Sequence, residues 1–457
     1  MKLERFKEKD SKRKFIIIFT VCCILLLAGV FLYTSFAVFT EEKQFNVING
    51  TYQDPGDIYF AVYIDGEITN TFPSKDSGYY FESGSCTNGV AIEWNNYAWK
   101  ANLDYGQYEA SQGMATRVKC TLNFKKSHFS ESVTTCGQRG DNAASCIKDN
   151  AGDNPVELVY DGTTDNNLRY VGNNPNNYVS FNGELWRIIG VINNIDDGNG
   201  TKESRLKLVR SNSIGQYSWD TSTSNNWHGI NEWSQADVMK LLNPGYESES
   251  IGGSLYYNRR SGNCYNDLNN KYGACDFSSS GLTDDTKNYI TTAVWHTGSN
   301  DEENSYDNIK ASKFYELERS DNTGKICSSG IYCNDTVSRT TTWTGYVGLI
   351  YPSDFGYATS GGANMNRDLC LNIYLNDYKE WEECFNNNWL DGSSKWTMTP
   401  HAYADGSYTV FNTYTHGEVG FNAAFSTIGI YPVVYLKSSV KITGGDGSEE
   451  SPFTLSL

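Results

Sequence analysis

The pattern of apolar and polar positions begins with one long uncharged run, from Phe15 to Phe39. A helix rises about 1.5 Å per residue, so a run of this length is sufficient to cross the roughly 30 Å hydrocarbon core of a bilayer. Seven lysines and arginines precede it, and retained positive charge favours the cytoplasmic side. The pattern predicts a basic cytoplasmic tail over residues 1–14, a single-pass transmembrane helix over residues 15–39, and an extracellular body held at the cell membrane.

A cleaved signal peptide is the alternative interpretation of this run. Ser35-Phe36-Ala37 places small residues at the two positions that a signal peptidase inspects. However, the apolar stretch from Phe15 to Tyr33 is longer than the roughly 7 to 15 residues of a signal-peptide core. We therefore favour an uncleaved anchor over cleavage after Ala37, and both interpretations export the rest of the chain.

Short runs of alternating residues follow, and they predict a small antiparallel β domain over residues 45–125. The run from Ile58 to Ile64 is followed by Asp65-Gly66, which is a strong hairpin signal. Periodicity is then lost over residues 126–155, which contain the close pair Cys136 and Cys146. We interpret this segment as a disulfide-pinned linker.

The remaining residues, 156–457, mix strand patterns with a few short helical ones. The clearest hairpin in the chain surrounds the Asn182-Gly183 turn. Helix-capping residues precede apolar positions near Ser234 and Thr283, and a third helix is expected from Ile309 to Leu317. Strands and helices interleave without βαβ regularity, so the predicted fold class is α+β.

Composition narrows the range of partners. The formal net charge is −17, and an acidic surface repels the phosphates on which nucleic-acid binding depends. We therefore expect no nucleic-acid partner.

The twelve cysteines divide into two groups. Cys22 and Cys23 lie inside the apolar run, and the other ten follow it. An even number in an oxidising location favours disulfides between sequence neighbours, and no C-x-x-C or zinc-finger spacing indicates a metal site. The predicted disulfide cysteines are Cys86, Cys120, Cys136, Cys146, Cys264, Cys275, Cys327, Cys333, Cys370 and Cys384.

A disulfide between Cys370 and Cys384 would constrain the local secondary structure. The apolar residues between Leu371 and Trp381 recur at helical spacing. A continuous helix would hold Cys370 and Cys384 about 21 Å apart, whereas bridged alpha carbons lie within roughly 7 Å of each other. If the two cysteines pair, the helix must therefore break, and we expect the break near Asn376-Asp377.

Motifs for catalysis and cofactor binding are missing from the sequence, and no cofactor is predicted. His401, Asp405 and His416 could meet across a hairpin as a base or as ligands, but surface or packing roles are favoured. The loop Asp196 to Thr201 has calcium-like chemistry, but its order of ligands misses the EF-hand pattern. We favour a solvated hairpin turn there.

A denser group of polar and aromatic residues follows the apolar strand that ends at Ile350. Aromatic rings beside carboxylate and hydroxyl groups suit the faces and hydroxyls of sugars. Packing within the fold is the alternative, and it is favoured on general grounds. The candidate ligand-binding residues are Tyr351, Ser353, Asp354 and Tyr357.

Several segments together resemble a known family. These are residues 165–179, Phe181 to Val191 (FNGELWRIIGV), Gly348 to Ala358 (GLIYPSDFGYA) and Pro432 to Leu436. They resemble a family of uncharacterised Gram-positive surface domains, and the resemblance covers residues 156–457. It implies a C-type-lectin-like topology related to formylglycine-generating-enzyme domains.

The sequence lacks two motifs that functional relatives of this family carry. The Glu-Pro-Asn sugar motif of calcium-dependent lectins is not present, because Asn174-Pro175-Asn176 lacks the carboxylate. The paired catalytic cysteines of the sulfatase-modifying enzymes are not seen either. The amino-terminal part is more weakly similar to camelysin-type exported proteins.

Together these features predict a membrane-anchored extracellular surface protein. Its distal domain would act as a non-enzymatic binding or adhesion module for a glycan or protein ligand. One alternative is an enzyme of the formylglycine-generating type or a cell-wall hydrolase, using residues such as Asp354, His401 or Glu383. Another is a structural matrix component assembled through exposed β edges.

Overall fold

In the computed structural model, not every part of the chain is described. The described residues are 58–69, 71–75, 77–96, 98–105, 118–222, 229–267, 270–299, 309–321, 323, 337–401 and 408–457. The chain forms two compact units, of which the larger includes Thr121–Leu457 and contains the sites discussed below.

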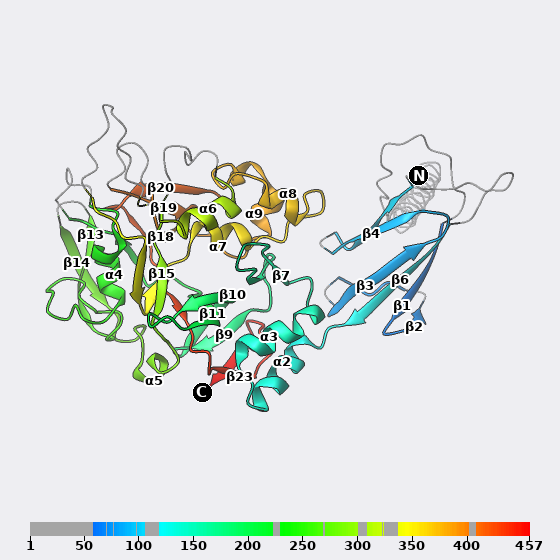
Figure 1. Cartoon of the computed structure of the whole chain (residues 1–457), viewed down its shortest axis with the longest axis horizontal. Helices are drawn as coiled ribbons and strands as arrows, with labels where there is room; N and C mark the ends of the chain where they lie inside the picture. The colour runs from blue at the N-terminus through cyan, green and yellow to red at the C-terminus, as the bar shows by residue number, and fades with distance from the viewer. Residues whose placement is uncertain are drawn as a thin grey trace, which may run out of the picture. The chain divides into compact units, whose positions relative to one another are not determined.

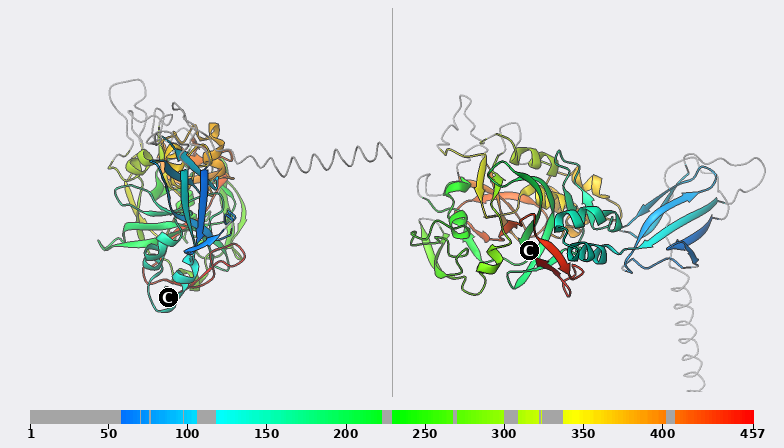
Figure 2. Two further views of the ribbon diagram at one scale, coloured as in Figure 1. Left: turned by 90° about the vertical axis from the view of Figure 1, so that its right-hand side faces the viewer. Right: turned by 60° about the horizontal axis from the view of Figure 1, so that its bottom comes forward.

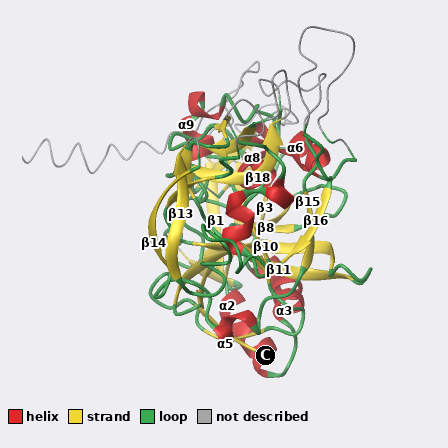
Figure 3. Cartoon of the chain, turned by 90° about the vertical axis from the view of Figure 1, so that its left-hand side faces the viewer, coloured by secondary structure: helices red, strands yellow, loops and turns green. Residues whose placement is uncertain are grey.

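The predicted α+β class is wrong, because the described chain is mainly β. Strands account for 39% of these residues and helices for 18%, and strands dominate Figure 3. The helical patterns in the sequence give only short helices, from four residues in α5 to ten in α2. Frequent Gly, Pro and Asn between them end each helix within three turns.

The single transmembrane helix in the predicted fold is not supported either. None of the helices that the structure describes is long and apolar enough to span a bilayer. The predicted span, residues 15–39, lies outside the described residues, as does the tail before it.

A four-stranded sheet with the order β2-β1-β6-β3 forms within residues 58–126, beside the two-stranded sheet β4-β5. The predicted Asp65-Gly66 hairpin is confirmed: the two residues have φ of 50° and 84° and join β1 to β2. Trp94 packs against Trp99 and Phe124, as expected of packing residues. The strands are β1 Ile58–Ile64, β2 Glu67–Thr69, β3 Tyr79–Cys86, β4 Ala91–Asn95, β5 Lys100–Asp104 and β6 Val118–Lys126.

A nine-stranded sheet forms the centre of the larger unit, with the path β17-β22-β11-β10-β9-β24-β23 and with β7 and β8 beside β10. Figure 1 shows β9, β10 and β11 side by side. The predicted Asn182-Gly183 hairpin is confirmed, with φ of 60° and 75° at its turn. The strands are β7 Leu158–Tyr160, β8 Leu168–Tyr170, β9 Tyr178–Phe181, β10 Glu184–Asp196, β11 Lys202–Arg210, β17 Val347–Gly348, β22 Val433–Tyr435, β23 Lys441–Gly444 and β24 Phe453–Ser456.

A five-stranded sheet with the order β12-β21-β18-β19-β20 packs in the same unit, together with two separate hairpins, β13-β14 and β15-β16. Buried tryptophans from these elements, such as Trp219, Trp295 and Trp396, belong to the same core as Trp186 of the central sheet. The strands are β12 Gln216–Ser218, β13 Ser261–Asp267, β14 Lys271–Asp276, β15 Ala293–His296, β16 Thr342–Gly345, β18 Lys395–His401, β19 Thr409–Thr413, β20 Val419–Ala423 and β21 Thr427–Gly429.

Short helices cover and connect these sheets. Thr283 caps α5 through the backbone N–H of Thr286, as predicted. The α-helices are α2 Phe129–Gln138, α3 Ala143–Asn150, α4 Asp237–Leu242, α5 Asp284–Lys287, α6 Ala311–Glu318, α7 Pro352–Tyr357, α8 Arg367–Leu371 and α9 Glu382–Asn386. The 3-10 helices are η1 Ala151–Asp153, η2 Trp233–Gln235 and η4 Tyr378–Glu380.

The segment interpreted as a linker contains the two helices α2 and α3 instead. Phe129, Val133 and Cys136 are buried at helical spacing, and α2 lies against β23 (Figure 2). Because polar residues surround the buried face of α2, its helical periodicity is difficult to recognise in the sequence. A disulfide joins Cys136 to Cys146, so the pinning was predicted correctly while the secondary structure was not.

Four of the predicted disulfides are confirmed among the described residues. They are Cys86–Cys120, Cys136–Cys146, Cys264–Cys275 and Cys370–Cys384. Cys327 and Cys333 lie outside the described residues. In the last pair the alpha carbons are 5.5 Å apart, and the helical pattern between them breaks into α8, η4 and α9, with Asn376-Asp377 in the break.

The close packing of α2 on β23 makes Gly137 sensitive to substitution. A Cβ at Gly137 would lie 1.9 Å from the backbone carbonyl oxygen of Ile442. We expect Gly137→Ala to lower the free energy of unfolding by about 1–3 kcal/mol, because backbone must move to relieve this overlap. Urea denaturation measures the loss.

The matched control is Gly152→Ala in η1, where an added Cβ meets nothing within 4 Å. This exposed position should change stability by less than about 0.5 kcal/mol. Equal effects of the two substitutions would contradict the packing of α2 against Ile442.

Candidate functional site

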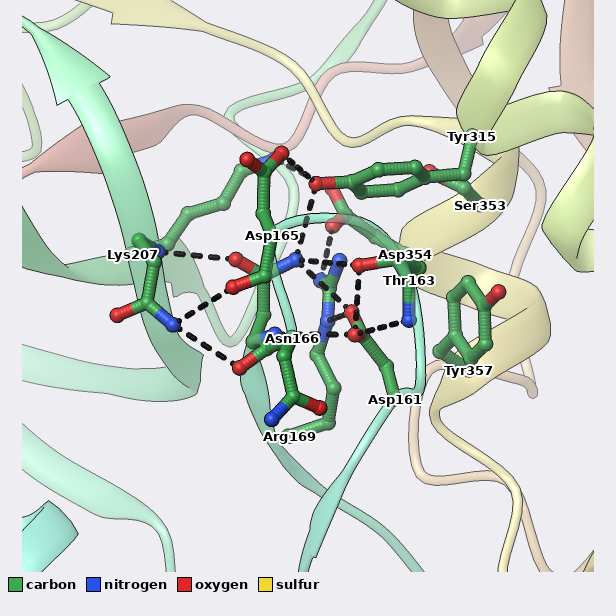
Figure 4. A network of polar contacts seen from close by, with 12 residues as sticks. Asp161, Thr163, Asp165, Asn166, Arg169, Lys207, Tyr315, Ser353, Asp354 and Tyr357 are labelled. Carbon is green, nitrogen blue, oxygen red and sulfur yellow. Dashed lines mark hydrogen bonds and ion pairs between the residues drawn. The ribbon is translucent and has the colours of Figure 1, made fainter.

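The four candidate ligand-binding residues are Tyr351, the N-cap of α7, and three residues of α7 itself. Ser353, Asp354 and Tyr357 lie in or beside a buried ionic network (Figure 4). The exposed fractions of the four residues are 1% for Tyr351, 0% for Ser353, 2% for Asp354 and 3% for Tyr357. The structure brings them together, but it places all four within the protein rather than on a surface.

Asp354 is the centre of this network. Its Oδ1 accepts a hydrogen bond from Arg169 Nη1 at 2.6 Å, and its Oδ2 accepts one from Lys207 Nζ at 2.5 Å. The backbone N–H of Tyr351 donates to the same Oδ2 at 3.0 Å. Arg169 Nε donates in turn to Asp161 Oδ2 at 3.0 Å, so two carboxylates and two cations form one chain of ion pairs.

The electrostatics of the network favour its charged form. Burial alone would raise the pKa of Asp354, but Lys207 and Arg169 hold that pKa at about 2. Burial lowers the pKa of Lys207 to about 8, even though Asp354 opposes this. Both groups are therefore charged at neutral pH, and their charges are satisfied by each other and by Arg169.

A second buried carboxyl group lies against the same helix. Glu318 at the end of α6 accepts hydrogen bonds from Ser353, at 3.0 Å from its backbone N–H and 2.5 Å from its Oγ. Burial raises the pKa of Glu318 to about 7, although Arg319 and the Ser353 bonds lower it. Through these two hydrogen bonds Ser353 links α7 to the end of α6.

This raised pKa predicts a pH dependence of stability. The folded pKa lies above the ordinary value of 4.5, so the Glu318 contribution is complete below about 4.5 and is lost as the pH rises through about 7. We expect the free energy of unfolding of Glu318→Gln, relative to the wild type, to rise between pH 5 and pH 8. Urea titrations of both proteins at four pH values measure the difference.

Other buried groups with a raised pKa, such as Asp237 at about 7, are present in both proteins and cancel in this comparison. Gln keeps an oxygen for the Ser353 backbone N–H. Parallel stability curves for the two proteins from pH 5 to pH 8 would contradict the assignment.

The residues considered for catalysis do not form one site. His401 lies buried against Phe411 and Phe421, and burial lowers its pKa to about 3. Asp405 lies outside the described residues, and His416 is exposed. The carboxylate of Glu383 accepts hydrogen bonds from Asn364 and from the backbone N–H of Met365, so it holds a turn together.

The acidic loop between β10 and β11 is the hairpin turn that we favoured. Asp196 Oδ1 accepts from the backbone N–H groups of Gly198 and Gly200, and Asp197 Oδ1 accepts from Asn199 and Thr201. Within the part of the chain that the structure describes, no group of three or more His, Cys, Asp or Glu is placed to hold a metal ion.

A pocket of about 240 Å³ opens on the central sheet of the larger unit. Its floor is a row of three residues from adjacent strands: Arg187 of β10 pairs in register with Tyr178 of β9 on one side and with Val209 of β11 on the other. Its walls come from the loop Trp389–Lys395 and from the residues that follow β11, together with Tyr431 and Glu449. Six separate segments thus converge on one cavity.

The Arg187 guanidinium is held rigidly in this floor. Nε donates to Asn177 Oδ1 at 2.7 Å, and Nη2 donates to Asn174 Oδ1 and to the Pro175 carbonyl oxygen, both at 3.2 Å. The guanidinium carbon lies 4.2 Å from the ring centroid of Tyr178 and 4.6 Å from that of Trp389. Burial lowers the pKa of Arg187 to about 10, so the group is charged at neutral pH.

Two polar groups of the pocket have no partner within the described chain. No atom accepts a hydrogen bond from Arg187 Nη1, and the three bonds above are those the side chain makes. Ser211 Oγ is shielded from solvent and has no hydrogen-bond partner among these residues. Both residues line the pocket.

Sequence reasoning missed this pocket. Trp186-Arg187 was recognised as part of a strong hairpin, but neither Arg187 nor Ser211 was singled out. The available signal was a charged residue within an otherwise apolar strand, flanked by Trp186 and Ile188. An arginine in such a position must be paired or must face a polar cavity.

Comparisons with protein family models, curated proteins and solved structures found no match to this chain. The resemblance to Gram-positive surface domains therefore stays a prediction from the sequence. Function has to be argued from the residues and geometry described above.

Proposed function

We propose that the protein is an exported binding protein that takes up part of a glycan or protein ligand in the Arg187 pocket. The observation that carries this proposal is the Arg187 guanidinium, which lines the cavity without an ion pair to any carboxylate of the described chain and shares that lining with the shielded, unpartnered hydroxyl of Ser211. Buried polar groups in native proteins are normally hydrogen-bonded, so exceptions at a cavity mark a place where a ligand completes the bonding.

The scaffold suits binding because it is already rigid. The floor is fixed by the strand register of β9, β10 and β11, and the guanidinium is fixed by three hydrogen bonds and two rings. A preformed site loses little conformational entropy when it binds. The four disulfides support an exported location, since such bonds persist in oxidising compartments.

Binding is favoured over the enzymatic alternative by the placement of the residues considered for catalysis. Asp354 is neutralised by Arg169 and Lys207, and eight of the external cysteines are joined in disulfides rather than held as nucleophiles.

The test is a screen of the full-length chain against a panel of glycans and surface proteins, with a variant that blocks the pocket. Asn212→Trp places a large ring on an exposed lining residue whose side chain makes no hydrogen bond within the described chain. We expect it to abolish any binding seen with the wild type while leaving thermal stability unchanged.

Asn288→Trp is the matched control, because Asn288 is an exposed residue after α5 that does not line the pocket. It should bind as the wild type does. A wild type that binds nothing on either panel, or binding that survives Asn212→Trp, would overturn the proposal.

A further inference from the structure

We infer that the Arg187 pocket binds the single carboxylate of an acidic sugar. The inference rests on the proposed binding function and adds the class of ligand. It is carried by the charge, the bonding and the lining of the pocket.

The first argument is the charge of Arg187. Its side chain is 9% exposed, and no carboxylate of the described chain lies within ion-pair distance of it. Its three hydrogen bonds go to neutral amide and carbonyl oxygens. Glu449 and Glu157 raise the pKa of Arg187 from a distance, but neither forms an ion pair with it. A buried cation that is only partly compensated is costly, and an anionic ligand that pairs with it directly removes that cost.

The second argument is the number and position of the available donors. Arg187 Nη1 offers N–H groups, and Ser211 Oγ offers an O–H. The backbone N–H of Ser211 donates to the carbonyl oxygen of Leu185 at 3.2 Å, which fixes Ser211 beside β10, two residues before Arg187. A carboxylate has two oxygens and can accept one hydrogen bond from each group.

The third argument concerns the rest of the ligand. Two carboxylates, Asp391 and Glu449, and two further cations, Arg210 and Lys395, also line the pocket. Arg210 pairs with Glu184, and Lys395 Nζ donates to the carbonyl oxygen of Leu390. With Arg210 already paired, the two carboxylates balance Arg187 and Lys395, so the lining has no excess of positive charge for a polyphosphate or a sulfated polymer. As hydrogen-bond acceptors, Asp391 and Glu449 match the hydroxyl groups of a sugar.

Pocket size and lining agree with a sugar. A volume of about 240 Å³ is below the roughly 300–1,000 Å³ of drug-sized ligands and suits one sugar ring. The rings of Tyr178 and Tyr431 are half-buried at its wall and give flat apolar surface next to the polar groups. An acidic peptide would also use the cation and offers backbone N–H donors, so the experiment includes one as a competitor.

The experiment compares glucuronic acid, glucose and a short aspartate-containing peptide as ligands of the full-length chain, by ligand-observed NMR and calorimetry. The wild type should bind glucuronic acid at least about tenfold more tightly than glucose or the peptide. Glucose lacks the carboxylate that would bond to the site, and the peptide lacks the sugar hydroxyls.

Ser211→Ala tests the site without endangering the fold. It removes a shielded hydroxyl that has no partner in the described chain, so thermal stability should stay the same or rise. Binding of glucuronic acid should nevertheless weaken about tenfold. The control Ser213→Ala, a nearby serine that does not line the pocket, should change neither property.

The outcomes separate this inference from the proposed function. Equal binding of glucose and glucuronic acid, or no effect of Ser211→Ala, overturns the carboxylate site, while the blocking variant Asn212→Trp still reports on binding in general. Equal or tighter binding of the acidic peptide overturns the sugar. A binder found on the wider panel with no affinity for glucuronic acid also overturns the inference and leaves the proposed function standing.

Discussion

Replacing Asp354 with Asn should lower the free energy of unfolding by about 3–5 kcal/mol, the largest effect that we expect from a single substitution. The carboxylate is 2% exposed and pairs with both Arg169 and Lys207. An amide has the same shape but no charge, and its NH2 group would face one of the two cations. Lys207 would then be buried without a counter-ion and Arg169 would keep only Asp161, which costs far more than the loss of an exposed pair.

Chemical denaturation of the wild type and Asp354→Asn measures this loss. Asp284→Asn is the matched control, because Asp284 also pairs with a lysine, Lys287 at 2.9 Å, but its side chain is 98% exposed. That substitution should cost less than about 1 kcal/mol. Similar losses for the two variants would show that burial does not set the strength of the Asp354 pairs.

A double substitution tests the reason for the loss. In Asp354→Asn with Lys207→Met, the cation that the first substitution leaves unpaired is replaced by an apolar chain of similar length. Lys207 lies 4.2 Å from the ring centroid of Tyr351, so the new side chain meets an aromatic surface. We expect the double variant to be more stable than the sum of the two single losses predicts, because the two residues interact directly.

Local chemistry explains which parts of the fold were predictable. The Asp65-Gly66 and Asn182-Gly183 hairpins were predicted from dipeptides that adopt positive φ, and both are present. The cap at Thr283 was predicted on the same local grounds. Each of these features depends on a few adjacent residues, which a single sequence displays.

Features that depend on distant contacts were not predictable. The sheet places β24, at the end of the chain, beside β9, and no local pattern specifies that pairing. The overestimate of helix in the predicted α+β class has the same origin, since residues near Tyr289 carry a helical pattern but β15, which begins at Ala293, pairs with β16 instead. Tertiary pairing overrode the local preference.

The candidate site illustrates the same limit. Tyr351, Ser353, Asp354 and Tyr357 were correctly recognised as a dense polar and aromatic group. Whether such a group faces solvent or the core depends on residues such as Lys207, which lies 147 positions away from Asp354 in the chain. The Arg187 pocket was missed because its lining comes from six segments that sequence reasoning could not bring together.

Removing the disulfide between Cys370 and Cys384 should cost about 3 kcal/mol, the second large effect that we expect. The two residues are 14 positions apart, and closing a loop of this length restricts the unfolded chain by roughly that free energy. Both cysteines are fully buried, so alanine is the better replacement, because serine would add a buried hydroxyl. Thermal and urea denaturation of Cys370→Ala with Cys384→Ala measure the loss.

This disulfide also decides between two local structures. The apolar spacing from Leu371 to Trp381 favours one continuous helix, and the bond forces the chain into α8, η4 and α9 instead. In the double alanine variant, hydrogen exchange over residues 372–381 should therefore become slower, because a continuous helix protects these amides, while the Cys264–Cys275 hairpin, whose strands are held by their own ladder, keeps its protection. Unchanged exchange over residues 372–381 would mean that packing of Leu375 and Tyr378 in the core breaks the helix without the bond.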